Sequence, residues 1–245
     1  MPADRLLERP AFILSTVRSG STLLRVLLDS HSELHAPHEL HLRDLGVKIR
    51  RKPGRKAMDA LGLDEEGLEY LLWDRLLHRE LTARGKRWLV NKTPNDVFIA
   101  ERIRACWPDA RFIYLLRHPA AIARSRAKAR PQDSEEQNVR MILRYAEALE
   151  AARARWPGHV VRYEDITTDP EGRLRELCAF LDVAFEPQML EYERFDHGEY
   201  RVGLGDWSKK IRSGQIQPAP PPPAHVPEGL RELCVTWGYA PSAAR

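Results

Sequence analysis

Hydroxyl side chains and one arginine gather in a short turn near the start of the sequence. The apolar run Ala11–Leu14 predicts a buried strand, and leucines spaced along 21–29 predict a helix. The residues that lead from the strand into the helix are Ser15, Thr16, Val17, Arg18, Ser19, Gly20, Ser21 and Thr22. A helix that begins after a strand and a glycine turn presents free N–H groups and its positive dipole end to an anion. The Arg18 guanidinium adds a fork that suits phosphate, so the turn predicts an oxyanion site.

The turn differs from the P-loop that binds ATP. Ser15 stands where that pattern has its first glycine and Ser21 where it has lysine, so only Gly20 and Thr22 remain. The missing lysine is the residue that reaches the β- and γ-phosphates. A donor with a single 5′ phosphate that carries a sulfate therefore suits the turn better than ATP. A plain turn with a serine or threonine helix cap is the alternative interpretation.

A second candidate anion site follows the apolar run 112–116, which predicts a core strand. Arg117 comes directly after this run, where ligands gather in open α/β sheets. Pro119 is typical of a helix start, and Ser125 lies eight positions after Arg117, about two helical turns along. Taken alone, Arg117 could cap a surface turn and Ser125 could be a packed helical serine. Arg130 is a further candidate contact, although the basic block 124–130 could also be a solvated face.

These motifs resemble those of a known family. Segment 16–24 is similar to the 5′-phosphosulfate loop of sulfotransferases that use 3′-phosphoadenosine-5′-phosphosulfate (PAPS). Segment 28–39 resembles the tyrosylprotein sulfotransferases and short bacterial sulfotransferases, and the likeness runs from Phe12 to about Trp207. The resemblance implies a P-loop-type α/β fold and transfer of a sulfuryl group from PAPS to an acceptor hydroxyl. It implies adenosine-3′,5′-bisphosphate (PAP) as the product and no metal requirement.

The resemblance also assigns donor-binding residues. The expected contacts of the loop are Arg18, Ser19, Gly20, Ser21, Thr22 and Leu23. Arg117 and Ser125 resemble the family's 3′-phosphate motif, an arginine after a strand with a serine eight residues on. Tyr163 resembles a tyrosine near the adenine, with a packed core tyrosine as the alternative. Trp207 and Lys209 look like parts of a late loop that covers the nucleotide.

Sulfuryl transfer needs a base near the acceptor hydroxyl, and segment 31–41 offers several. Glu39 matches the catalytic glutamate of the tyrosylprotein sulfotransferases and is the expected base. Histidine has this role in many cytosolic sulfotransferases, so His38 and His41 remain alternatives. Otherwise we expect these two histidines to bind the acceptor. The spacing of the histidines in this segment does not suggest a zinc site.

Charge on the transferred group needs fixed cations, for which Lys92 and Arg18 are the candidates. Lys92 follows the predicted strand 88–90 in the order Asn91-Lys92-Thr93-Pro94. The family has a lysine in a similar Lys-x-Pro setting, where it contacts the sulfuryl group and the bridging oxygen. A solvated lysine before a turn is the alternative.

Strands and helices alternate along the 245 residues, which predicts one α/β domain with a parallel sheet. We expect the sulfotransferase domain over 1–217. The proline-rich segment and a last helix, over 218–245, would dock on the same domain through Leu230 and Leu233. Helices are expected over 97–106 and 135–155, and a helix over 65–82 is expected to turn four leucines inward. These are Leu68, Leu71, Leu72 and Leu76.

Composition narrows the function classes. The absence of a long apolar run and of an apolar leader predicts no membrane span and a cytoplasmic location. Three cysteines at unrelated spacings predict reduced thiols. The net charge of +4 suits an anionic ligand, and the basic stretch 43–56 suits an anionic acceptor unless it is only a solvated loop. The acceptor itself and the oligomeric state are not predicted.

Two other functions are compatible with parts of the sequence. A P-loop nucleotide kinase is disfavoured by the missing lysine and by the lack of an obvious magnesium carboxylate. A nucleic-acid-binding protein is disfavoured because no helix-turn-helix, zinc or aromatic RNA motif accompanies the basic stretches.

Overall fold

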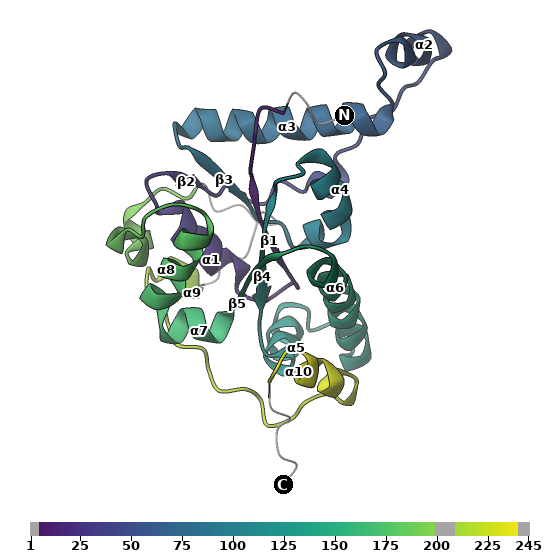
Figure 1. The fold of residues 1–245 in the computed structure, drawn as a ribbon. Helices are drawn as coiled ribbons and strands as arrows, with labels where there is room; N and C mark the ends of the chain where they lie inside the picture. Colours follow the sequence, from purple (N-terminus) through teal and green to yellow (C-terminus); the bar gives the residue numbers. More distant parts are fainter. Residues whose placement is uncertain (1–4, 199–208, 240–245) are drawn as a thin grey trace.

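The computed structural model describes residues 5–198 and 209–239, and five parallel strands form its sheet (Figure 1). The strands are β1 (Ala11–Ser15), β2 (Leu34–His35), β3 (Trp88–Asn91), β4 (Arg111–Leu116) and β5 (Gly158–Arg162). Their order is β2-β3-β1-β4-β5. β1 is central because it pairs with β3, where Ala11 is opposite Val90, and with β4, where Phe12 is opposite Phe112.

Helices connect the parallel strands, as crossover connections require. The α-helices are α1 (Ser21–Asp29), α2 (Lys52–Ala60), α3 (Glu65–Arg84), α4 (Ala100–Cys106), α5 (Pro119–Ala129), α6 (Glu135–Arg155), α7 (Tyr163–Thr168), α8 (Pro170–Phe180), α9 (Lys209–Arg212) and α10 (Arg231–Thr236). The 3₁₀ turns are η1 (Leu42–Asp44), η2 (Pro94–Ile99), η3 (Pro187–Leu190), η4 (Tyr192–Arg194) and η5 (Glu228–Leu230). The predicted parallel sheet flanked by helices is confirmed.

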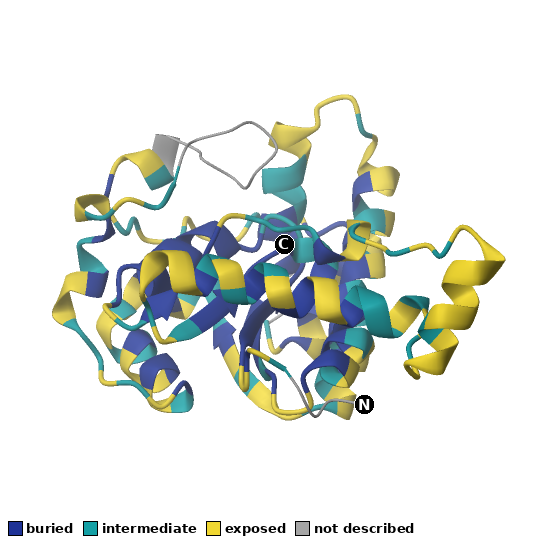
Figure 2. Cartoon of the chain, turned by 90° about the horizontal axis from the view of Figure 1, so that it is seen from above, coloured by how far each residue is buried: buried dark blue, intermediate teal, exposed yellow. Residues whose placement is uncertain are grey.

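The strands divide the core into two layers because successive side chains point to opposite faces of the sheet. Phe12 and Leu14 of β1 pack with α3, α4, α6 and α10, whereas Ile13 packs with α1 and α8. All three side chains are completely buried. Figure 2 shows the buried strands between helices whose outer faces are exposed. Burial on both faces explains why β1 and β4 are continuous apolar runs in the sequence.

Two predicted helices differ from the structure. In α3, Leu71 and Leu72 are exposed, so the prediction that they point inward is wrong. The inward face of α3 instead holds Tyr70, Trp73, Leu77 and Leu81. Their helical spacing competes with that of the leucines, and the larger aromatic side chains are the ones buried. The helix expected from Val97 becomes α-helical only at Ala100, because residues 94–99 form the 3₁₀ turn η2.

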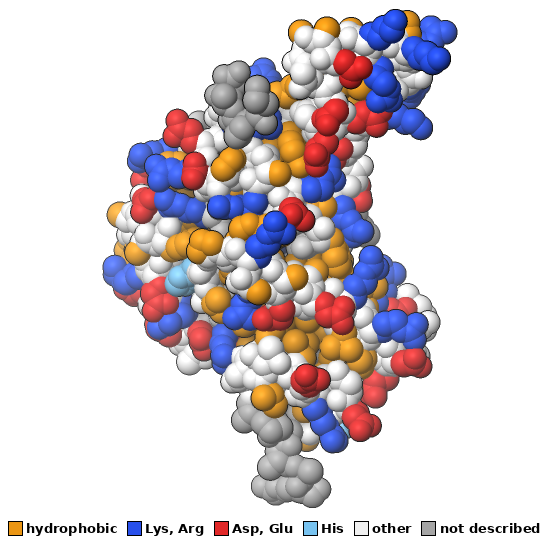
Figure 3. All heavy atoms as spheres, turned by 45° about the vertical axis from the view of Figure 1, so that its right-hand side comes forward, with side chains coloured by type: hydrophobic (Ala, Val, Ile, Leu, Met, Phe, Trp, Pro, Cys, Tyr) orange, Lys and Arg blue, Asp and Glu red, His pale blue; other side chains and the backbone are white. Residues whose placement is uncertain are grey.

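The basic stretch contains a helix that was not predicted. α2 extends past the end of α3 at the upper right of Figure 1, and it has no buried residue. Lys and Arg side chains cover this projection in Figure 3. Pro53 near the helix start favours α2, whereas Gly54 weakens it.

The C-terminal segment packs against the core of the domain. Leu230 and Leu233 are buried in the core layer of α5 and α6. Arg162 at the end of β5 donates hydrogen bonds to the carbonyls of Trp237 and Gly238. Among the described residues, no helix is long and apolar enough to cross a membrane.

Candidate active site

One cavity of about 690 Å³ opens where the parallel strands end. Its walls come from the segments that follow four different strands: Arg18 after β1, Pro94 after β3, Arg117 after β4 and Tyr163 after β5. This edge of an open α/β sheet is where ligands bind. The predicted site residues that line the cavity are Arg18, Gly20, Ser21, Thr22, Leu23, Glu39, Arg117, Ser125 and Tyr163.

The turn after β1 has a left-handed backbone at its centre, which favours glycine. Gly20 precedes α1 with a φ of +86°, and no side chain caps the helix there. A β-carbon on Gly20 would also overlap the Tyr163 ring, which lies against it. Arg18 has a φ of +64°, and the buried hydroxyls of Thr16 and Ser19 lie 2.5 Å apart. Gly20, Ser21 and Thr22 at the start of α1 line the cavity, where a helix N-terminus favours an anion.

The two predicted anion sites touch each other. Arg18 Nε donates to Ser125 Oγ at 3.2 Å, and Arg117 Nη1 donates to the Arg18 carbonyl at 2.9 Å. The Arg117 guanidinium also lies 4.3 Å from the centre of the Tyr163 ring. Burial lowers the pKa of Arg117. The guanidinium still keeps its charge, because arginine is not deprotonated in proteins. Residues that are 107 positions apart in the sequence thus form one cationic wall.

Glu39 and Lys92 form an ion pair beside the cavity. Lys92 Nζ lies 2.5 Å from Glu39 Oε1, with the lysine side chain 1% exposed and the glutamate 13% exposed. Glu39 lines the cavity, and Lys92 lies behind it. His41 Nε2 is 3.6 Å from Glu39 Oε2, whereas His38 is exposed and its Nδ1 lies 3.1 Å from the Glu39 carbonyl oxygen.

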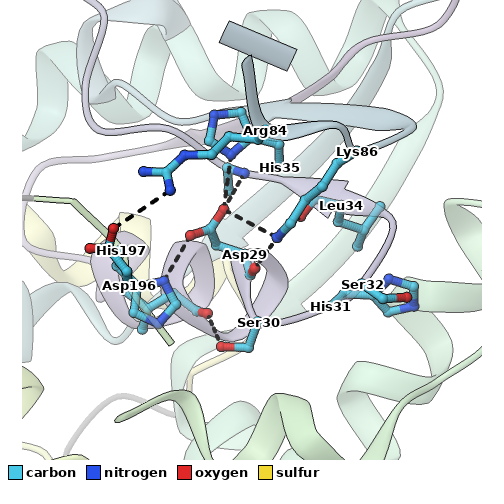
Figure 4. Close-up of polar contacts among 12 residues, drawn as sticks. Asp29, Ser30, His31, Ser32, Leu34, His35, Arg84, Lys86, Asp196 and His197 are labelled. Atoms are coloured by element: carbon cyan, nitrogen blue, oxygen red, sulfur yellow. Dashed lines mark hydrogen bonds and ion pairs between the residues drawn. The ribbon is translucent and has the colours of Figure 1, made fainter. Parts of the chain in front are cut away.

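Asp29, at the end of α1, fixes the segment that carries Glu39 (Figure 4). Its Oδ1 accepts hydrogen bonds from the Ala36 N–H at 2.8 Å and from His35 Nδ1 at 3.1 Å. Its Oδ2 accepts one from His197 Nδ1 at 2.8 Å. Burial alone would raise the pKa of Asp29, but the hydrogen bonds from His197, His35 and Ala36 hold it well below its usual range. The carboxylate therefore stays ionised and ties both segments to α1.

The same aspartate reaches the opposite wall of the cavity. His197 Nε2 lies 2.8 Å from the Tyr192 carbonyl, and the Tyr192 hydroxyl donates to the Ile211 carbonyl at 3.1 Å. Tyr192 and Ile211 both line the cavity. Asp29 thus links the strand that leads to Glu39 with the wall that contains Tyr192 and Ile211.

Several cavity residues were not predicted. They are Val17, Pro94, Ala121, Arg124, Lys128, Ala129, Tyr192, Ile211, Gln215, Gln217 and Pro220. The proline-rich segment crosses the rim, where Arg124 donates to the Pro221 carbonyl and the Ala219 N–H donates to Thr167 Oγ1. The sequence signals for this arrangement were the basic block 124–130 and the expected docking of the proline-rich segment, and neither identified the lining residues.

The side chains of the two residues expected to cover the nucleotide, Trp207 and Lys209, lie outside what the structure describes. Trp207 lies outside the described residues. Lys209 begins the short helix α9, and its side chain also lies outside what the structure describes. Arg130 is exposed and does not line the cavity. Within 5–198 and 209–239, no group of three His, Cys, Asp or Glu side chains could hold a metal ion.

Comparison with known proteins gives the family of this chain. A family model described as the sulfotransferase family matches residues 10–187. The nodulation protein NoeE of Sinorhizobium fredii (strain NBRC 101917 / NGR234) is 28% identical over 224 residues, covering 77% of this chain and 53% of that protein. Protein-tyrosine sulfotransferase 2 of Gallus gallus is 23% identical over 199 residues, covering 74% of this chain and 53% of its own. The chain therefore spans about half the length of these curated relatives.

A solved structure covers the whole length of the described fold. The sulfotransferase domain from the Synechococcus PCC 7002 olefin synthase superimposes with a TM-score of 0.72 at 26% identity, covering 98% of both chains. The expected P-loop-type fold and the predicted resemblance are confirmed. The chain belongs to the sulfotransferase family.

Proposed function

We propose that this protein transfers a sulfuryl group from PAPS to an acceptor hydroxyl. The observation that carries the proposal is the contact between the two anion sites, Arg18 with Ser125 and Arg117 with the Arg18 carbonyl. A donor with phosphates on both its 5′ and 3′ sides needs two such sites in one cavity. Arg124 and Lys128 add positive charge to the same walls, which suits a multiply charged anion.

In the proposed reaction, the acceptor oxygen forms a bond to sulfur while the bond from sulfur to the 5′-phosphate oxygen breaks. The hydroxyl proton passes to Glu39, and PAP leaves with the electron pair of the broken bond. The Lys92 ammonium and the N–H groups at the start of α1 stabilise the negative charge on the transferred group and the leaving oxygen. Burial of Lys92 strengthens that effect because little water screens its charge.

Glu39 is the base that the geometry supports best. It lines the cavity, whereas His41 lies beside Glu39 and does not. For His41 and the exposed His38 we propose contact with the acceptor, as expected from the sequence. The Lys92 ammonium lies beside the Glu39 carboxylate, so an opposite charge faces the proposed base.

The acceptor is proposed only as a hydroxyl-bearing molecule. Protein-tyrosine sulfotransferase 2 is named for peptide tyrosine, and the exposed cations of 48–56 would favour an anionic acceptor. The division into a 1–217 domain with a docked 218–245 segment, and a cytoplasmic location, stay predictions. No observation favours a kinase or nucleic-acid binding.

Calorimetry with three nucleotides tests the proposal. PAP should bind far more tightly than AMP or ATP in the absence of magnesium, since only PAP fills both anion sites. Ser125→Ala should weaken PAP binding while leaving AMP binding close to wild type, so that the preference for PAP shrinks. Equal affinities for the three nucleotides in the wild-type protein would contradict the proposed donor.

A further inference from the structure

A second carboxyl group is buried behind the Lys92–Glu39 pair. Asp96 lies in η2, and its side chain is completely buried. Asn91 Nδ2 donates a hydrogen bond to Asp96 Oδ2 at 2.6 Å. Asp96 Oδ1 and Asn91 Oδ1 are both buried, and neither has a hydrogen-bond partner among the described residues. Asn91 and Asp96 thus enclose a short stretch of chain that contains Lys92.

An ionised carboxylate is disfavoured at this position. A buried carboxylate needs several hydrogen bonds or a bonded cation, and Asp96 receives one hydrogen bond from a neutral amide. Burial raises the pKa of Asp96 to about 8; the charge of Glu39 adds to this effect, while the Asn91 hydrogen bond and Lys92 oppose it. At neutral pH the group is therefore a carboxylic acid, whose hydroxyl can donate where a carboxylate could not.

The surroundings of Asp96 show which charge its ionisation would affect. Glu39, His41, Arg43 and Asp44 come from the loop and from η1, Lys92 comes from the end of β3, and Arg144 and Tyr145 come from α6. β1 brings no titratable side chain, and the charged residues of α4 are engaged elsewhere, Arg102 with Glu69, Glu101 with Arg155 and Arg104 with the Ala110 carbonyl. Arg144 and Arg43 lie over the Phe98 ring. Lys92 is thus the cation that ionisation of Asp96 would attract most directly.

We propose that Asp96 is a positioning residue that, as a neutral acid, leaves the Lys92 ammonium directed at Glu39 and the donor. When Asp96 loses its proton, a second buried negative charge competes with Glu39 and the sulfuryl group for that ammonium. This inference rests on the proposed function, because it assigns Lys92 and Glu39 their roles in sulfuryl transfer. It adds a residue that does not line the cavity.

The expected signature is a fall in turnover on the alkaline side. With half-ionisation near pH 8, the neutral form of Asp96 falls about tenfold between pH 7 and pH 9, and kcat should fall with it. Asp96→Asn keeps the shape of the neutral acid and cannot ionise, so its ratio of kcat at pH 9 to kcat at pH 7 should approach one. Asp44→Asn is the matched control, because Asp44 is a nearby but largely exposed carboxylate, and it should retain the tenfold fall.

Infrared spectroscopy of the wild-type protein supplies a readout that does not depend on turnover or on the folding of a variant. The wild-type protein at pH 7 should show the carbonyl stretch of a buried carboxylic acid, which should disappear as the pH passes 8. Asp96→Asn should lack this band, and Asp44→Asn should keep it. A wild-type protein without the band, or an Asp96→Asn enzyme with an undiminished alkaline fall, would overturn the proposal. If PAPS were not the donor, the band would still be present, so the two failures are distinguishable.

Discussion

Replacing Arg117 by alanine tests the donor site most sharply, because this side chain does two things. Its Nη1 donates to the carbonyl of Arg18, a residue with left-handed backbone, and its guanidinium lies on the Tyr163 ring. Its Nε is buried and has no hydrogen-bond partner among the described residues. We infer that Arg117 both holds the turn after β1 in shape and is free to take the 3′ phosphate.

The two roles have separate magnitudes. A charge-assisted hydrogen bond to phosphate contributes about 2 kcal/mol, so Arg117→Ala should weaken PAP binding about 30-fold. The lost bond to the Arg18 carbonyl and the lost ring contact each contribute about 1 kcal/mol to folding. For a chain of this size, a total of about 2 kcal/mol lowers the Tm by about 4–8 °C.

Calorimetry with PAP and thermal unfolding without ligand measure the two effects independently. Arg117→Lys keeps the charge but not the fork, so its affinity should fall between those of the wild type and the alanine variant. Arg130→Ala is the control, because Arg130 is an exposed arginine that does not line the cavity. The reasoning is refuted if Arg117→Ala binds PAP like the wild type, or if Arg130→Ala loses as much affinity.

Other variants probe the elements that shape the site. Gly20→Ala should abolish PAP binding in a titration, because the new β-carbon meets the Tyr163 ring and a φ of +86° costs alanine about 1–2 kcal/mol; a variant that binds normally would contradict the role of this turn. Asp29→Asn should lower both stability and turnover by releasing the Glu39 segment, and turnover like that of the wild type would refute the link. Folding lowers the pKa of Asp29, so its ionised carboxylate stabilises the folded state fully at pH 7 and progressively less as the pH falls below 3.8. Urea titrations of the wild type and Asp29→Asn measure this contribution. A stability difference between the two proteins that does not change with pH would contradict it.

The sequence predicted most of the elements because the local signals are strong. The helix Ser21–Asp29 was predicted with its observed bounds, and the helix over 135–155 is likewise as predicted, with Ser134 and Gln137 forming a capping box at its start. Leu71 and Leu72 were wrongly predicted to be buried. Two groups of apolar residues in this helix have helical spacing, and only packing in the folded protein decides which group is buried. The helix over 52–60 was missed because its residues include proline, glycine and many charges and bury nothing.

The site was predicted only as far as motifs reach. Arg18, Arg117 and Ser125 could be selected because each follows a predicted strand or lies at a set spacing from one. The contact of Tyr163 with Gly20 and the link from Asp29 through His197 to Tyr192 join distant segments, so no local pattern announces them. Asp96 could not be selected either, because its burial depends on how η2 packs against β1, η1 and α6.

A single-turnover transfer experiment tests the central claim most directly. The protein is mixed with PAPS that carries a radiolabelled sulfate group and with a panel of hydroxyl acceptors, without added metal, at saturating donor. We predict that the wild type moves the label to an acceptor and releases an equal amount of PAP. Glu39→Gln should bind PAP almost as tightly yet transfer about 10²–10⁴-fold more slowly, while His41→Ala should lose less. Transfer by Glu39→Gln at the wild-type rate, together with an inactive His41→Ala, would contradict the assignment of the base. A wild-type protein that bound PAP no better than AMP and transferred no label to any acceptor would contradict the claim itself.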